Sequence, residues 1–142
     1  KRRFFMTVND KIHFKVITHE RVVFDDYVDE IYSKGIDGDF GVLYNHIPFM
    51  TALDIGVTKI VKDGDDDYIA TIGGTFQIND NVAVILTDEA QLGSDIDIVR
   101  AKNAQERALM RLNQSKPDTD IVRAEIALAK AMARLKAGSK YH

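Results

Sequence analysis

The sequence contains no cysteine, no tryptophan and only two prolines among its 142 residues. The absence of cysteine excludes disulfide scaffolds, thiolate zinc sites and cysteine nucleophiles, and it fits a reducing compartment. No apolar run approaches the roughly 20 residues that a membrane-spanning helix needs. The length suits one domain with at most one appended motif.

Charge is divided unevenly along the chain. Residues 1–97 carry 9 lysines and arginines against 18 aspartates and glutamates, a net charge of −9, whereas residues 98–142 carry 10 against 4, a net charge of +6. Eight of the nine glycines lie in the first part, and nine of the thirteen alanines lie in the second. The sequence therefore combines two architectures, an acidic part rich in turn formers and a basic part rich in helix formers.

Short runs in the first part alternate polar and apolar residues, which is the pattern of half-buried strands. They lie at residues 12–18, 57–62, 68–72 and 82–86, and turn formers such as Asp37-Gly38, Gly73-Gly74 and residues 79–81 separate them. This close spacing leaves no room for helices and predicts an antiparallel sandwich or barrel.

The first part contains no recognisable catalytic or metal-binding motif. The acidic run at residues 63–67 resembles part of a calcium loop but lacks its full spacing and its terminal glutamate. We therefore interpret this run as a solvated hairpin tip that blocks edge pairing. The four histidines are scattered, and neither a G-x-S-x-G motif nor a phosphate-binding loop occurs. We predict no metal site and no enzymatic activity.

The second part is an internal repeat. Residues 97–101 recur unchanged as residues 120–124, and the apolar positions around both copies follow helical spacing. Helices are predicted at 97–112 and 120–135, with a capping box at Ser94 and Asp97 and a break at residues 117–119. Alanine-rich faces bury little surface, at about 0.8 kcal/mol per methylene, so the predicted hairpin is weakly held and a candidate for movement.

Two basic stripes lie on the sides of the helices away from the apolar faces: Arg100, Arg107 and Arg111 in the first helix, and Arg123, Lys130 and Arg134 in the second. Such charges usually form a solvated face, but their repetition favours a docked anion such as a nucleotide, an acidic protein surface or nucleic acid. The acidic first part disfavours nucleic acid, and apolar faces of alanine rather than Trp or Phe disfavour membrane insertion. The residues alone leave three interpretations of the basic stripes open: a solvated face, a nucleotide-binding site and a contact with an acidic protein surface.

An acidic β domain followed by a basic hairpin resembles the epsilon subunit of the F-type ATP synthase, called delta in mitochondria. The resemblance extends over nearly the whole chain from Met6. Its motifs are residues 16–20, residues 38–43 followed by 46–48, Gly73-Gly74 with Phe76, and residues 87–90. Residues 96–101 also match the I-D-x-x-R-A signature with which some bacterial epsilon subunits bind ATP.

The resemblance implies an α+β fold in which a ten-stranded antiparallel β-sandwich precedes a two-helix hairpin. The sandwich would seat on the gamma subunit and the membrane c-ring, in the central stalk of a proton-translocating rotor. A glycine-rich loop with an acidic residue and a histidine faces the ring in relatives, which points to Asp39 and His46. Tyr44-Asn45 replaces the usual Pro-Gly of that loop, and we expect Asn45 to tolerate the left-handed backbone.

The hairpin of this family inhibits ATP hydrolysis by extending between the alpha and beta subunits. Its basic face would then meet acidic beta-subunit segments through Arg111, Arg123, Lys130 and Arg134. ATP would act as a regulatory ligand that favours the folded hairpin, with no cofactor required. The residues implied in ATP binding are Ile96, Asp97, Arg100 and Ala101 around the adenosine, with Arg107, Lys130 and Arg134 at the phosphates.

Two departures from the ATP-binding pattern weaken that expectation. Gln91 stands where ATP-binding relatives often have glutamate, and Lys130 stands where arginine is frequent. Lysine keeps the charge but loses the planar fork that binds phosphate through two hydrogen bonds.

The expected organisation is an extension or expression remnant at residues 1–5, a sandwich at 6–90 and a regulatory hairpin at 91–142. The expected location is the cytoplasmic face of a bacterial plasma membrane, as a peripheral, non-catalytic subunit. The alternative is a stand-alone nucleotide-binding or adaptor module that uses the basic hairpin.

Overall fold

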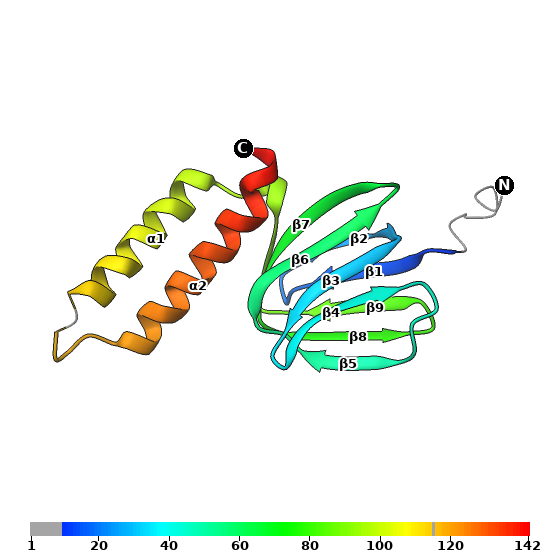
Figure 1. Ribbon diagram of the computed structural model, residues 1–142, viewed down its shortest axis with the longest axis horizontal. Coiled ribbons are helices and arrows are strands. Elements are labelled where there is room, and N and C mark those ends of the chain that lie inside the picture. Colours follow the sequence, from blue (N-terminus) through cyan, green and yellow to red (C-terminus); the bar gives the residue numbers. More distant parts are fainter. Residues whose placement is uncertain (1–9, 115) are drawn as a thin grey trace.

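The computed structural model describes residues 10–114 and 116–142. The expectations for residues 1–5 and for a start at Met6 lie outside these ranges. Ten strands form two stacked sheets, and a pair of helices lies against one side of them (Figure 1). This arrangement confirms the predicted fold class.

Each sheet has five strands. The first has the order β2-β1-β9-β8-β5, formed by Val22–Val28, Ile12–Ile17, Val82–Leu86, Thr75–Asn79 and Phe49–Ala52. The second has the order β10-β7-β6-β3-β4, formed by Glu89–Leu92, Asp65–Ile72, Ile55–Lys62, Glu30–Gly35 and Gly38–Leu43. The four strand runs read from the sequence correspond to β1, β6, β7 and β9.

Two details differ from the sequence prediction. The pairing of β1 with β9 is parallel, whereas an antiparallel sandwich was expected, because the chain crosses between the sheets before β9 returns beside β1. Strand β10 continues to Leu92, which pairs with Ile69 of β7, so the second sheet extends two residues past position 90. Both differences depend on pairing between distant segments, which alternation within a segment does not reveal.

The main core lies between the sheets. Alternating residues of the strands point inward, and Phe14, Phe76 and several isoleucines and valines are fully buried there. A buried hydroxyl chain crosses the second sheet, since Thr58 Oγ1 lies 2.8 Å from Ser33 Oγ and 3.1 Å from Thr71 Oγ1. These hydrogen bonds satisfy the polar groups that this sheet buries.

Helices α1 (Ile98–Asn113) and α2 (Ile121–Gly138) form the predicted hairpin. Both begin with the aspartate of the internal repeat: Asp97 accepts a hydrogen bond from the Arg100 N–H at 3.1 Å, and Asp120 accepts one from the Arg123 N–H at 3.0 Å. Asp97 is thus itself the N-cap, which corrects the predicted capping box with Ser94. Ser94 lies instead in a short 3-10 turn, η3 (Gly93–Asp95), that leads from β10 into the hairpin.

Candidate functional site

The hairpin docks on the outer face of the second sheet through α2. Helix α2 packs against β6, β7 and β10, and α1 lies on its far side, away from the sandwich (Figure 1). A small second core joins the two parts and contains Ala70 of β7, Ile96, Ala101 and Ala137, with Val57, Tyr68, Ile98 and Leu135 packed against it. Small residues allow close approach but bury little apolar area, so this interface is weaker than the main core.

Two glycines show how close that approach is. A Cβ atom built on Gly93 would lie 2.3 Å from the Ala137 carbonyl oxygen and 2.9 Å from the Tyr68 carbonyl oxygen. A Cβ on Gly138 would lie 2.8 Å from Ile98 Cδ1. The backbone of η3 therefore touches both α2 and β7, and no larger residue fits at position 93 without displacement.

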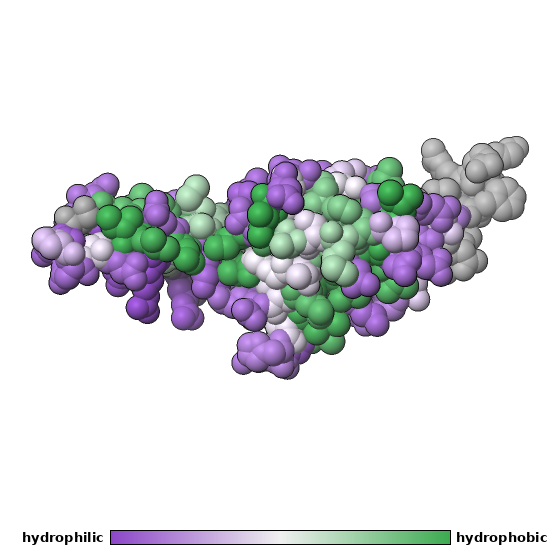
Figure 2. All heavy atoms as spheres, turned by 90° about the horizontal axis from the view of Figure 1, so that it is seen from below, coloured by the Kyte–Doolittle hydropathy of each residue, from purple (hydrophilic) through white to green (hydrophobic). Residues whose placement is uncertain are grey.

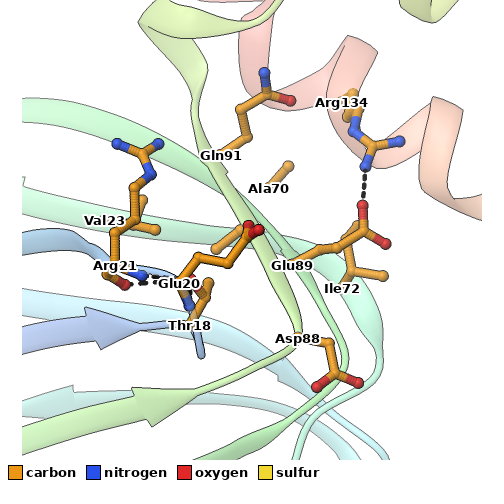
Figure 3. Close-up of a pocket in the computed structure, with 11 residues that line it drawn as sticks. Thr18, Glu20, Arg21, Val23, Ala70, Ile72, Asp88, Glu89, Gln91 and Arg134 are labelled. Atoms are coloured by element: carbon orange, nitrogen blue, oxygen red, sulfur yellow. Dashed lines mark hydrogen bonds and ion pairs between the residues drawn. The ribbon is translucent and has the colours of Figure 1, made fainter.

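An ionic cluster joins α2 to the start of β10. Glu89 accepts a hydrogen bond from Lys130 Nζ at 3.0 Å through one carboxylate oxygen and from Arg134 Nη2 at 2.8 Å through the other. Figure 3 shows the Arg134 guanidinium pointing from the helix toward Glu89. The hydrogen bond from Lys130 and the charges of both cations hold the pKa of Glu89 below its usual value. Glu89 was not among the predicted site residues, because its role depends on helix docking.

The predicted adenosine residues have structural roles in this conformation. Ile96 and Ala101 are buried in the second core, and Asp97 caps α1. The structure thus brings Ile96 and Ala101 together and pairs Lys130 with Arg134 through Glu89. Arg100 and Arg107 are exposed on α1, the helix farther from the sandwich.

Four arginines of the basic stripes face solvent. Arg100, Arg107, Arg111 and Arg123 are all exposed, and they take part in none of the ion pairs found among residues 10–114 and 116–142. The two stripes therefore divide into a docked pair, Lys130 and Arg134, and an outer group available to a partner.

Hollows lie on both sides of α2. The one beside Glu89 has a volume of about 230 Å³ and is lined by Gln91 and Arg134 among mainly polar residues (Figure 3). This is below the roughly 300–1,000 Å³ typical of small-molecule sites. On the other side, a groove of about 970 Å³ lies between α2 and β3, β4 and β6, but it contains none of the residues implied in ATP binding.

The residues implied in ring docking lie at opposite ends of one sandwich edge. Asp39 is exposed at the start of β4, and half-buried His46 follows its end, with ring Nδ1 2.7 Å from the Ile47 carbonyl oxygen. Strands β4 and β5 are the edge strands of their sheets, and an isolated bridge between Gly35, at the end of β3, and Leu53, just after β5, links the two sheets near this edge. We call this the β4–β5 edge.

The β4–β5 edge carries exposed large apolar side chains: Ile36 at 64%, Leu43 at 54%, Ile47 at 74% and Met50 at 66% exposure. Apolar surface gathers on the lower side of the sandwich in Figure 2. Exposed large apolar side chains along a sheet edge suit an interaction surface.

A pair of asparagines holds the loop before β5. The Asn45 N–H donates to Asn81 Oδ1 at 2.6 Å, and Asn81 Nδ2 donates to Asn45 Oδ1 at 3.1 Å. Asn45 has a φ of 66°, as expected from the sequence for a residue in place of glycine. The substitution therefore keeps the turn and adds a link to the β8–β9 turn.

The acidic run at residues 63–67 is a largely exposed hairpin tip, as the sequence suggested, but it also contacts the end of the helical hairpin. It spans the β6–β7 turn and the first three residues of β7, and those three residues contact a 3-10 turn, η4 (Ser139–Tyr141), that follows α2. Sequence reasoning missed this contact because it joins residues more than 70 positions apart. In the described ranges, no group of three or more His, Cys, Asp or Glu side chains is placed to hold a metal.

The two parts of the chain match two domains of one family. Residues 11–93 match the ATP synthase Delta/Epsilon chain beta-sandwich domain, and residues 94–138 match the long alpha-helix domain of the same chain. A β-sandwich domain followed by a long α-helix domain thus defines the class, the delta and epsilon chains of ATP synthases.

Proteins with similar sequences belong to the same class. The ATP synthase epsilon chain of Carboxydothermus hydrogenoformans is 48% identical over 92% of this chain and 98% of its own length. That of Nitratidesulfovibrio vulgaris strain DP4 is 38% identical over 74% and 78%, respectively. The chain belongs to the ATP synthase delta/epsilon family and is an epsilon chain of the F-type ATP synthase.

Solved structures share the fold. A chain of the Euglena gracilis mitochondrial ATP synthase, in a structure of OSCP/F1/c-ring, matches with a TM-score of 0.77 at 24% identity, covering 92% of this chain and 82% of that one. A chain of the Tetrahymena thermophila central stalk and c-ring matches with a TM-score of 0.52 at 13% identity, over 92% and 95%. None of the helices in the described residues is long and apolar enough to cross a membrane.

Proposed function

We propose that this chain is a non-catalytic central-stalk subunit of a proton-translocating ATP synthase, that its sandwich docks on the gamma subunit and the c-ring, and that its hairpin inhibits ATP hydrolysis. The observation that carries the proposal is the division of the molecule into a sandwich with a large core and a hairpin attached mainly through one helix with a small second core. The c-ring and central-stalk assemblies that contain the matched chains support it. We place it at the cytoplasmic face of a bacterial plasma membrane.

The β4–β5 edge is the proposed docking surface for the ring and the gamma subunit. Asp39 and His46 mark its two ends, and exposed apolar side chains lie along it. An apolar centre with polar ends is the composition of a protein interface. The hairpin packs on β6, β7 and β10, so docking through this edge leaves the hairpin free to move.

The exposed arginines of the hairpin are the proposed contacts with the acidic beta-subunit segments. Arg111 and Arg123 are exposed and outside the docked interface. Lys130 and Arg134 are paired with Glu89, and release of α2 from the sheet would free both for such a partner. Charge steering of this kind weakens as salt concentration rises.

The inhibition is tested with the full chain reconstituted into the ATP synthase. We expect an Arg111→Gln, Arg123→Gln double variant to assemble normally and to raise ATP hydrolysis, because each change removes a charge that attracts the catalytic subunits. The matched control is a Lys102→Gln, Lys116→Gln double variant, which removes the same total charge at other exposed hairpin positions. Equal hydrolysis in the two double variants would contradict the proposed inhibitory contact.

ATP is the proposed regulatory ligand of the docked hairpin. The support is the position of Lys130 and Arg134 beside the hollow next to β10. Lys130 and Arg134 already donate hydrogen bonds to the Glu89 carboxylate. Phosphate oxygens of ATP would therefore compete with this carboxylate for the same two donors. A ligand specific to the docked state stabilises that state by RT ln(1 + [L]/Kd).

Calorimetric titration with ATP, with and without magnesium, tests this ligand. The internal repeat supplies a control that separates capping from binding, since Asp97→Ala and Asp120→Ala each remove the cap of one helix. We expect Asp97→Ala and Arg134→Ala to weaken binding and Asp120→Ala to leave it nearly unchanged. No heat of binding at millimolar ATP would remove ATP from the proposal and leave the docking surface untouched.

A further inference from the structure

The 3-10 turn η4 holds the end of the hairpin on the first residues of β7, next to the β6–β7 turn. Tyr141 Oη donates a hydrogen bond to Asp67 Oδ1 at 2.7 Å, and Lys140 Nζ lies 3.2 Å from Asp65 Oδ1 and 3.9 Å from Asp67 Oδ1. Lys140 also donates to the Asp66 carbonyl oxygen. The acidic turn of the sandwich thus meets two donors that follow α2.

The Tyr141 phenol completes an unfinished sheet edge. Strand β10 pairs with β7 only as far as Ile69, opposite Leu92, so the next outward N–H of β7, that of Tyr68, lies beyond the end of β10. That N–H donates to Tyr141 Oη at 3.2 Å. The neutral phenol therefore accepts from the backbone and donates to Asp67 at once, which a phenylalanine at this position does not do.

The same ring lies where the hairpin leaves the sandwich. A Cβ on Gly93 would lie 2.5 Å from Tyr141 Cε2, so the ring packs directly on the backbone of η3. The contact joins the first residue after β10 to the turn that follows α2. The two ends of the hairpin are therefore fastened to the sandwich and to each other at one place.

We propose that Ser139–Tyr141 is a latch that keeps the hairpin docked, and that Asp65, Asp67 and the Tyr68 N–H are its receptor. The helix interface buries only Ala70, Ile96, Ala101 and Ala137 in its core, so these directional contacts add to a small apolar interface in holding the docked state. Undocking of α2 requires that the latch open. The latch is a property of the isolated chain, and only its effect on ATP hydrolysis rests on the proposed inhibitory function.

A distance measurement on the full chain tests the latch. Since the sequence has no cysteine, spin labels attach only at Asp37→Cys in the β3–β4 turn and Gln114→Cys after α1, both exposed positions. Pulsed electron paramagnetic resonance then gives the docked and undocked populations. We expect Tyr141→Phe, which keeps the ring but loses its hydroxyl, to raise the ratio of undocked to docked molecules about fivefold or more.

Matched controls separate the latch from general effects of substitution. Tyr27→Phe makes the same change at an exposed tyrosine that stacks on His13, and Lys102→Ala removes the same charge as Lys140→Ala from an exposed position on α1. Both controls should leave the ratio unchanged, whereas Lys140→Ala should raise it and do so less at high salt. A ratio that stays at its original value in both Tyr141→Phe and Lys140→Ala overturns the latch.

A double variant tests whether donor and receptor act together. Tyr141→Phe and Asp67→Ala break the same hydrogen bond, so the double variant should raise the undocked ratio by less than the product of the two single effects. Independent, multiplicative effects overturn the assigned pairing. All of these measurements use the isolated chain, so a failure of inhibition in the assembled ATP synthase leaves their outcome intact.

Discussion

Gly93 is the position at which one added methyl group should move the hairpin. In Gly93→Ala the new Cβ would lie 2.3 Å from the Ala137 carbonyl oxygen, 2.5 Å from Tyr141 Cε2 and 2.9 Å from the Tyr68 carbonyl oxygen. Two of these neighbours are backbone atoms, one on α2 and one on β7, so a side-chain rotation does not relieve the overlap. Relief requires that the η3 backbone shift relative to both α2 and β7, which disrupts the docked interface.

The size of the effect follows from the cost of overpacking. An extra methylene in a well-packed site costs typically about 1–3 kcal/mol. In the undocked state the new methyl group meets neither α2 nor the latch, so the cost falls mainly on the docked state. A difference of about 1–3 kcal/mol lowers the ratio of docked to undocked molecules by about 5- to 150-fold.

The labelled pair at positions 37 and 114 measures this ratio in the Gly93→Ala chain. Gly56→Ala is the matched control, because the nearest atoms to its new Cβ belong to the flexible Lys34 side chain, at 3.0 and 3.1 Å. Gly56→Ala should leave most molecules docked. If Gly93→Ala keeps a folded sandwich and the docked population of the original chain, the close packing of η3 does not control docking, and the reasoning is wrong.

Four further predictions concern polar contacts. Glu89→Gln should weaken hairpin docking by about 0.2–1 kcal/mol, the range for exposed ion pairs, while Asp88→Asn at the neighbouring exposed position should not, as the same distance measurement will show. The lowered pKa of Glu89 means that its contribution is present above pH 4.5 and is lost as the pH falls through the lowered value, which acid titration of the docked population checks. Burial, together with the hydrogen bond to Asp67, raises the pKa of Tyr141 to about 12 from 10.0, so the latch should hold below pH 10 and open as the pH rises toward 12, in step with phenolate absorbance. Asn81→Ala should free the loop after β4 and speed amide exchange there, with β6 unaffected.

As a consequence of these contacts, the hairpin is held on the sandwich by several weak interactions. Glu89 joins α2 to β10, the latch joins η4 to β7, and small residues pack between them. The polar contacts are partly exposed and the apolar interface is small, so a competing acidic surface or a nucleotide has only modest interactions to replace. This arrangement suits a segment that is released by a partner rather than by unfolding of the sandwich.

Local patterns in the sequence were sufficient for four of the ten strands, for both helices and for the division into two parts. Alternation predicted β1, β6, β7 and β9, and the repeat at residues 97–101 and 120–124 predicted two similar helices. The aspartate of each repeat became an N-cap, since capping depends on side-chain and backbone groups only three residues apart. Family resemblance supplied the number of strands, which periodicity alone had left open.

The sequence by itself determined an acidic β domain, a basic hairpin and its alanine-rich faces, because these follow from composition and from spacings of two to four residues. Only the tertiary structure decided which residues join the two parts. Glu89 meets residues 41 and 45 positions away, and the acidic turn meets Tyr141 over 74 positions. Such contacts arise from the docking of α2 on one particular sheet face, which depends on shape and close approach at Gly93 and leaves no periodic signal in the chain.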